Sequence, residues 1–237
     1  MPIPIADVNP TPKSHRSLIT FILIALNILI FVLVQNGLSD HVSQESLLKF
    51  GLIPSVFWGE NQLPQQYQLF YYPLTLVTHV FLHGDLMHLA SNLIILWVFG
   101  DNIEQAFGRI GYLVFYLAGG LAAGLLHAYI DAGSVAPLIG ASGAISAIGA
   151  AYLLLYPRAV LWVLLFWIIP VKLPAWVAIG AWFIYQIYAS MAAGEQLVAW
   201  WAHIGGFVFG IGYILAFKRQ LIDGFYRKLF SKSTDIG

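Results

Sequence analysis

The sequence predicts an all-α, polytopic membrane protein built as a bundle of six transmembrane helices. Of its 237 residues, 59% are hydrophobic and only 9% are charged, and its mean hydropathy is +0.79. Soluble domains contain about 25% charged residues, so a water-facing globule of this composition would expose a large apolar surface. The formal net charge is zero, which argues against a nucleic-acid partner. The chain therefore belongs in a lipid bilayer.

Six apolar segments are candidates for membrane-spanning helices. A helix needs about 20 mainly apolar residues to cross the hydrocarbon core, and about 17–25 are tolerated. The segments are residues 18–34, 86–99, 112–130, 142–156, 175–189 and 200–217. The shorter ones need shielding by neighbouring helices. The first is longer than the apolar core of a signal peptide, which is about 7–15 residues, so we expect it to remain as a membrane helix.

A further apolar segment, residues 159–169 (AVLWVLLFWII), ends at Pro170 and is followed by Pro174. It is too short to cross the bilayer, and proline interrupts a helix. We therefore expect an interfacial or re-entrant segment rather than a seventh span.

The distribution of basic residues supports six spans. With a cytoplasmic N-terminus, only Lys49 lies outside, as the positive-inside rule requires. The basic residues on the inner side are Lys13, Arg16, Arg109, Arg158, Lys172, Lys218, Arg219, Arg227, Lys228 and Lys232. Residues 1–17 then form a short cytoplasmic segment, residues 18–217 a membrane domain with a long outer loop at about 35–78, and residues 218–237 a basic cytoplasmic tail.

Polar side chains gather at one depth near the outer ends of the predicted spans. They are His83, His88, Asn92, Ser142 and His203. Polar groups within a membrane are costly and are functional candidates by default. His88 and Asn92 are four residues apart and share one helix face. The alternative is that these groups only satisfy one another across helices.

Ser142 and His203 fit the requirements of nucleophilic catalysis. A nucleophilic serine needs a base within hydrogen-bond reach, and His203 begins the last span at the matching depth. No acidic residue lies within the last three spans, since Glu195 precedes the sixth, so we expect a Ser-His dyad without the usual carboxylate. The Ser142 N–H and the side chains of His88 and Asn92 would stabilise an oxyanion.

Helix packing is the competing explanation for the small residues around Ser142. Gly206 and Gly210 are four apart, a spacing that favours close packing, and Gly143 follows the serine directly. Both explanations can hold, because close packing of the fourth and sixth spans would bring Ser142 to His203.

Three motifs in order resemble those of the rhomboid intramembrane serine proteases. They are HGDLMHLASN at residues 83–92, GASG at 140–143 and AHIGG at 202–206. The resemblance extends over about residues 72–217. FGDNIE at residues 99–104 is similar to bacterial members of the family. Each motif is weak alone, and their order and depth make the resemblance specific.

This resemblance implies that Ser142 is the nucleophile and that His203 is the general base and later the general acid. It implies that His88 and Asn92 assist the oxyanion and that Gly140 belongs to the serine loop, which continues into Gly143. The substrates would be membrane proteins whose transmembrane segment unwinds near the outer surface. No metal or cofactor is expected. The protein would be an integral, multi-pass protein of a bacterial inner (cell) membrane.

Two departures from the family pattern concern positioning. Many members carry a Trp-Arg pair in the first loop, where this chain has YYPLTL at residues 71–76. Some carry a tyrosine four residues after the serine, stacked on the catalytic histidine, where this chain has Ser146. Trp182 and Tyr185 on the fifth span are candidates for a substrate gate, although membrane aromatics also serve as packing or interface anchors.

Other classes of protein fit the sequence less well. A non-catalytic rhomboid-like protein that binds membrane clients typically loses the serine or the histidine, and a small transporter would carry charged residues in mid-span. A metalloprotease needs His-Glu-x-x-His, but Val80 follows His79 where the glutamate would stand. An aspartyl protease needs a membrane-embedded partner for Asp101.

Overall fold

The computed structural model describes residues 3–8, 17–39, 41–68, 71–165, 168–192 and 198–222. The remaining positions include part of the predicted cytoplasmic segments and of the 159–169 segment. Residues named in the sequence analysis that lie outside the described ranges are Lys13, Arg16, Glu195, Arg227, Lys228 and Lys232.

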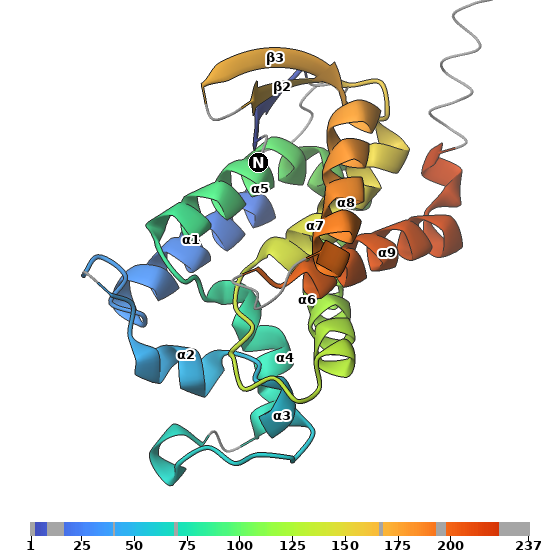
Figure 1. The fold of residues 1–237 in the computed structure, drawn as a ribbon. Coiled ribbons are helices and arrows are strands. Elements are labelled where there is room, and N and C mark those ends of the chain that lie inside the picture. The colour runs from blue at the N-terminus through green and yellow to red at the C-terminus, as the bar shows by residue number, and fades with distance from the viewer. Residues whose placement is uncertain are drawn as a thin grey trace, which may run out of the picture.

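All six predicted spans form α-helices (Figure 1). Their bounds are α1 (Leu18–Leu33), α5 (Leu86–Phe107), α6 (Arg109–Ile130), α7 (Ser142–Leu155), α8 (Ala175–Ala192) and α9 (Trp200–Phe217). By length and composition, α5, α6, α8 and α9 are long and apolar enough to cross a membrane, while α1 and α7 are shorter apolar helices. The described chain is therefore mostly helical and has the architecture of a multi-pass membrane protein.

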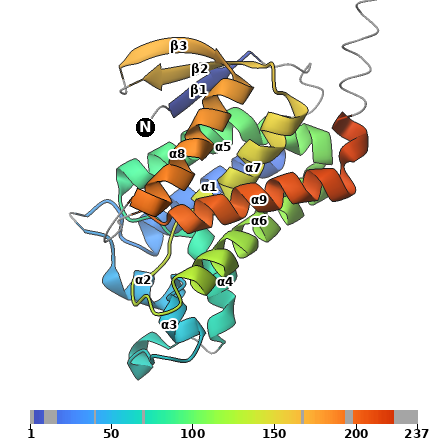
Figure 2. The same ribbon diagram turned by 45° about the vertical axis from the view of Figure 1, so that its right-hand side comes forward.

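Helix α7 occupies the centre of the bundle. It packs against α5, α6, α8 and α9, as Figure 2 illustrates. Glycines on α9 permit the close approach to α7. A Cβ on Gly206 would overlap the carbonyl oxygen of Gly143, and one on Gly210 would come 2.5 Å from the carbonyl oxygen of Ala147. Packing by small residues therefore holds α7 and α9 together.

The all-α prediction was wrong in one region, where the structure has a three-stranded antiparallel sheet. The strands are β1 (Ile3–Asp7), β2 (Val160–Leu165) and β3 (Ile169–Pro174), in the order β1-β2-β3. Most of the 159–169 segment thus forms β2 and the start of β3. Its Val, Leu and Trp residues favour strands, and Pro170 lies in an edge strand, where proline is tolerated. The sheet lies at one end of the bundle (Figure 1).

The sheet is fastened to the helices by Asp7 at the end of β1. Its carboxylate accepts hydrogen bonds from Asn102 Nδ2 of α5 at 2.8 Å and from the Tyr152 hydroxyl of α7 at 2.7 Å. Strand β3 ends at Pro174, and α8 begins at the next residue. The sheet therefore joins the N-terminal segment to α5, α7 and α8 at one end of the molecule.

The predicted outer loop is structured at the opposite end. It contains α2 (Gln44–Phe50), α3 (Pro54–Phe57) and α4 (Thr75–Thr78), with 3₁₀ turns at Gln65–Tyr67 and Tyr72–Leu74, and a further 3₁₀ turn at His79–Phe81 follows it. The Tyr72 hydroxyl accepts a hydrogen bond from the Ile53 N–H at 3.0 Å, and Trp58 Nε1 donates to the Ala128 carbonyl of α6 at 2.7 Å. These contacts anchor the loop in a chain that lacks the family's Trp-Arg pair.

Candidate active site

Ser142 and His203 lie in direct hydrogen-bond contact. Ser142 is the first residue of α7, and His203 is in the first turn of α9. The distance from Ser142 Oγ to His203 Nε2 is 2.7 Å. Because Gly206 is one turn beyond His203 and packs directly on Gly143, the contact between the two helices sets the spacing of the two reactive groups.

Gly140 allows the loop before Ser142 to adopt a backbone conformation with positive φ. This residue has φ +118°, in the region that favours glycine. Its N–H donates to the His79 carbonyl at 2.9 Å. A Cβ at Gly140 would lie 2.7 Å from His88 Nε2 and 3.6 Å from Ser142 Oγ. The space in front of Gly140 therefore adjoins both the serine and the His88 ring.

His88 presents a ring nitrogen to this space. The residue is fixed at the start of α5, where Asp85 caps the helix by accepting the His88 N–H at 2.7 Å. The Gly84 N–H donates to His88 Nδ1 at 3.3 Å, which makes Nδ1 an acceptor and leaves the proton on Nε2. The Nε2–H group consequently faces Gly140 and suits an oxyanion donor.

Asn92 lies one turn further along α5 and is 4% exposed. It lines the same cavity as Ser142. Its Nδ2 donates to the His88 carbonyl at 3.0 Å, within its own helix. The Asn92 amide can offer only its second hydrogen to a ligand without losing that bond.

Two further histidines support this region from the loop before α5. His83 is fully buried, and its ring packs edge-on against His88, with ring centroids 5.1 Å apart. Burial, together with the neighbouring His88, lowers the pKa of His83 to about 3. His79 Nδ1 donates to the Thr75 carbonyl at 2.8 Å, and burial lowers its pKa to about 4. Both rings are neutral at physiological pH.

An apolar cavity of about 200 Å³ extends from Ser142 toward the sheet. It is bounded by α5, α7 and α8 along its sides. Asn92, Ser142 and Trp182 line one part, while Pro4, Leu161, Val163 and Leu173 line the part formed by the sheet. The strands missed by sequence reasoning thus contribute a wall of the cavity that adjoins the serine.

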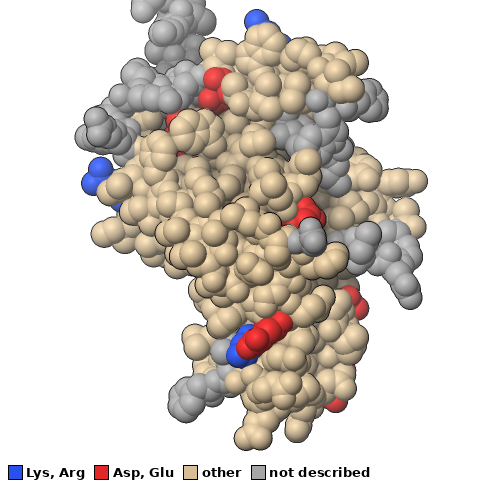
Figure 3. Space-filling model, turned by 90° about the vertical axis from the view of Figure 1, so that its left-hand side faces the viewer, with Lys and Arg blue, Asp and Glu red and all other residues tan. Residues whose placement is uncertain are grey.

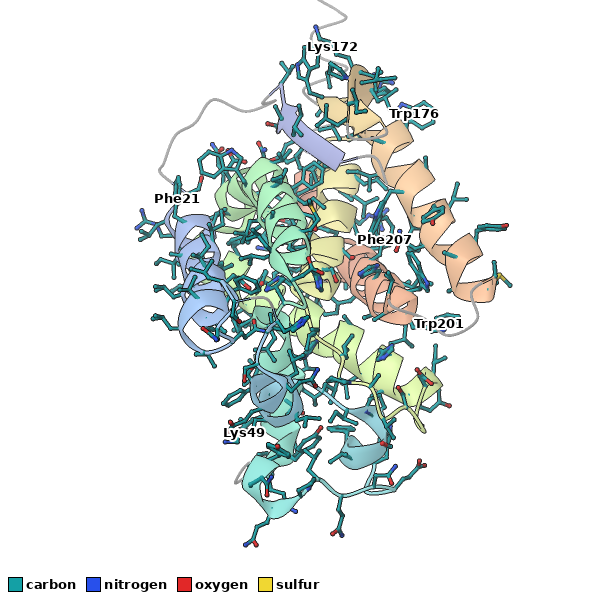
Figure 4. The ribbon with its side chains drawn as sticks, turned by 60° about the vertical axis from the view of Figure 1, so that its left-hand side comes forward. Phe21, Lys49, Lys172, Trp176, Trp201 and Phe207 are labelled. Carbon is teal, nitrogen blue, oxygen red and sulfur yellow. The ribbon has the colours of Figure 1, made fainter. Side chains whose placement is uncertain are left out.

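The two candidate gate residues on α8 face different ways. Trp182 lines the cavity, and its ring centroid is 6.0 Å from that of His203. Tyr185 is 45% exposed and packs edge-on against Trp200 at 5.8 Å. Figure 4 shows Trp176, near the other end of α8, pointing away from the bundle, while Phe207 of α9 lies inside it. Of the two candidates, only Trp182 contacts the site.

Sequence reasoning missed Gln186, which is fully buried on α8. Its Oε1 lies 2.7 Å from His203 Nδ1, on the side of the ring opposite Ser142. The third group of such a site is usually a carboxylate, whereas Gln186 carries an amide. The available signal was a glutamine in an otherwise apolar span, four residues after Trp182.

Within the described ranges, no three His, Asp or Glu side chains gather where they could hold a metal ion. The groups assembled around Ser142 are a base, hydrogen-bond donors and an apolar cavity, which suit acyl transfer to a serine hydroxyl.

Comparison with known proteins identifies the class to which this fold and site belong. The family model described as the rhomboid domain matches residues 71–220. The chain belongs to the rhomboid family, whose members are typically intramembrane serine proteases, and the resemblance seen in the motifs is confirmed.

Individual relatives are about one-third identical. The chain is 34% identical over 148 residues to the RHOMBOID-like protein 12, mitochondrial, of Arabidopsis thaliana, covering 56% of this chain and 43% of that protein. It is 32% identical over 147 residues to the presenilin-associated rhomboid-like protein A, mitochondrial, of Danio rerio, with coverage of 60% and 37%. It is 34% identical over 134 residues to the rhomboid protease GluP of Bacillus subtilis, with coverage of 56% and 24%. The matches thus span less than half the length of each of these relatives.

Proposed function

We propose that this protein is an intramembrane serine endopeptidase that cleaves transmembrane segments of other membrane proteins. The observation that carries the proposal is the 2.7 Å contact between Ser142 Oγ and His203 Nε2 beside an apolar cavity. Membership of the rhomboid family supports it. A protein that only binds membrane clients would have no need of a serine and a base in this contact.

The reaction follows from the positions of these groups. His203 Nε2 accepts the Ser142 proton as Oγ attacks the scissile carbonyl, and the resulting tetrahedral oxyanion receives hydrogen bonds from the Ser142 N–H, His88 Nε2–H and Asn92 Nδ2–H. His203 then donates its proton to the leaving amine as the C–N bond breaks. A water molecule, deprotonated by His203, attacks the acyl-enzyme, and the proton returns to Ser142 as the acid product leaves.

The substrate must present an extended backbone to Ser142. In a helix the scissile carbonyl is hydrogen-bonded within the segment, so segments that unwind easily near the membrane surface are the best substrates. Membership of the rhomboid family further supports cleavage after a small residue.

We further infer six membrane spans with both termini in the cytoplasm of a bacterial cell. Lys49 and Lys172 lie at opposite ends of the molecule (Figure 4), and charged side chains are sparse over the face drawn in Figure 3. The sheet end, with Lys172, would face the cytoplasm. Because α7 runs from Ser142 toward that end, Ser142 would lie near the outer surface.

The proposal predicts that both reactive side chains are required for cleavage. In proteoliposomes, the wild-type protein should cut a single-span reporter with a helix-destabilised, small-residue site, and Ser142→Ala and His203→Ala should each abolish cleavage. Ser190→Ala is the matched control, since among the described residues its hydroxyl donates to the Ile187 carbonyl of its own helix, and it should retain full activity. Cleavage by the Ser142→Ala protein at the wild-type rate would contradict the proposal.

A further inference from the structure

Gln186 is placed to orient the histidine of the proposed protease. Its side chain reaches from α8 to the ring of His203, with 2.7 Å between Oε1 and Nδ1. Gln186 is fully buried, so water does not compete for this contact. The contact joins α8 to α9 at the level of Ser142.

A second hydrogen bond defines which end of the amide faces His203. Gln186 Nε2 donates to the Trp182 carbonyl, one turn earlier on α8, at 3.4 Å. The reverse orientation would turn the amide oxygen toward that carbonyl oxygen, placing two acceptors together. The amide oxygen therefore faces His203.

This orientation selects one tautomer of His203. An amide oxygen only accepts hydrogen bonds, so Nδ1 must carry the proton, and the unprotonated nitrogen is Nε2. Nε2 is the atom 2.7 Å from Ser142 Oγ. The tautomer that Gln186 selects is the one that can accept the serine proton.

We propose that Gln186 is the positioning residue of a neutral Ser142–His203–Gln186 triad in this protein. The inference rests on the proposed protease function and replaces the dyad predicted from the sequence. Gln186 holds the imidazole in the basic tautomer and in the plane that faces Ser142. It does not touch the substrate and takes no proton.

A neutral amide suits this position in an apolar bundle. A carboxylate on α8 would be a buried charge, which is costly unless it is fully compensated. An amide oxygen performs the orienting role at a smaller desolvation cost, as asparagine does in the Cys-His-Asn arrangement of papain-like proteases. The rings of Trp182 and Trp200 lie 6.0 and 6.2 Å from the His203 ring and further confine it.

Ser146 cannot supply this support. It occupies the position where some relatives have a tyrosine stacked on the histidine, and its hydroxyl donates to the Ser142 carbonyl of its own helix at 2.6 Å. In this chain, α8 thus provides the positioning that α7 lacks.

The test compares Gln186→Leu and Gln186→Glu in the full-length protein in proteoliposomes, with Ser190→Ala as the control on the same helix. Gln186→Leu should lower kcat about 10- to 100-fold, because one hydrogen bond to a ring that becomes charged is lost, while KM stays unchanged. Gln186→Glu keeps an acceptor and adds a negative charge that stabilises the imidazolium. It should restore much of kcat and move the acid limb of the kcat–pH profile to higher pH. A purely structural role would alter stability and KM without this shift.

Wild-type kcat in Gln186→Leu, or an unshifted acid limb in Gln186→Glu, would overturn the inference while leaving the Ser142 requirement, and thus the proposed function, intact. The tautomer can also be measured without any Gln186 variant. In ¹⁵N-histidine-labelled wild-type protein, the His203 signals, assigned by their loss in His203→Ala, should report a protonated Nδ1. A protonated Nε2 in the neutral ring contradicts the inference, even if no proteolysis is detected.

Discussion

At the scale of single residues, the proposed chemistry depends on which hydrogen atoms are free to meet the oxyanion. The His88 Nε2–H faces Gly140, because Nδ1 accepts the Gly84 N–H. One hydrogen of the Asn92 amide is already engaged with the His88 carbonyl. His88 is therefore expected to contribute more to oxyanion stabilisation than Asn92.

We predict that His88→Ala lowers kcat more than Asn92→Ala does. Removing one oxyanion donor costs about 10²–10³-fold in kcat, and we expect His88→Ala within this range and Asn92→Ala below it. Steady-state cleavage of the reporter measures both. An equal or larger loss for Asn92→Ala would reverse the assignment of the main side-chain donor.

Most of the candidate site could be predicted at this scale, and one part could not. Ser142 and His203 stand out because hydroxyl and imidazole groups are rare and costly in apolar spans, and the structure brings them together. Gln186 could not be predicted, because spacing along the chain does not show that its amide on α8 faces the His203 ring on α9. The hydrogen bond depends on the rotation of α8 about its axis, which only tertiary packing determines.

At the scale of elements, the three-stranded sheet couples distant parts of the chain. Asp7 fastens β1 to α5 and α7 through Asn102 and Tyr152, and β1 pairs with the central strand β2. Pro4 of β1 also lines the cavity beside Ser142. The N-terminal segment therefore helps to determine the shape of the cavity.

We predict that Asp7→Ala loosens the sheet. The substitution removes the acceptor of the buried Tyr152 hydroxyl and one of the two acceptors of Asn102 Nδ2, which also donates to Asp101 at 2.9 Å. Losing these hydrogen bonds costs free energy, so β1 should detach more often. Hydrogen–deuterium exchange measured by mass spectrometry should become faster in the peptide covering β2. Glu60→Ala, in the outer loop, is the control that should leave this exchange unchanged. Wild-type exchange in the Asp7→Ala protein would show that Asp7 does not hold the sheet.

The helices could be predicted from the sequence, whereas the sheet could not. Long apolar runs identify membrane helices because the bilayer forces backbone groups to pair within each segment. The short run at residues 159–169 carries no such constraint, and one of its pairing partners, β1, lies at the far N-terminal end of the chain. The residue pattern alone does not show that two strands so far apart in the sequence pair with each other.

At the scale of the whole molecule, the structure divides into an end that holds the loops, an end that holds the sheet, and a helical bundle between them (Figures 1 and 2). Ser142 begins α7 at the loop end, and the adjoining cavity extends toward the sheet end. In a bilayer this arrangement would give a substrate segment access to the serine beside α8, while the packed helices limit access of bulk water.

The proposed function requires that Ser142 is a nucleophile activated by His203 inside a membrane protein. The most direct measurement is covalent labelling of the membrane-embedded protein with a fluorophosphonate probe, with the modified residue identified by mass spectrometry. We expect a single adduct on Ser142 in the wild-type protein, none in Ser142→Ala, and a strongly reduced labelling rate in His203→Ala. Wild-type protein that stays unlabelled, or labelling that is unchanged in Ser142→Ala, would show that Ser142 is not an activated nucleophile.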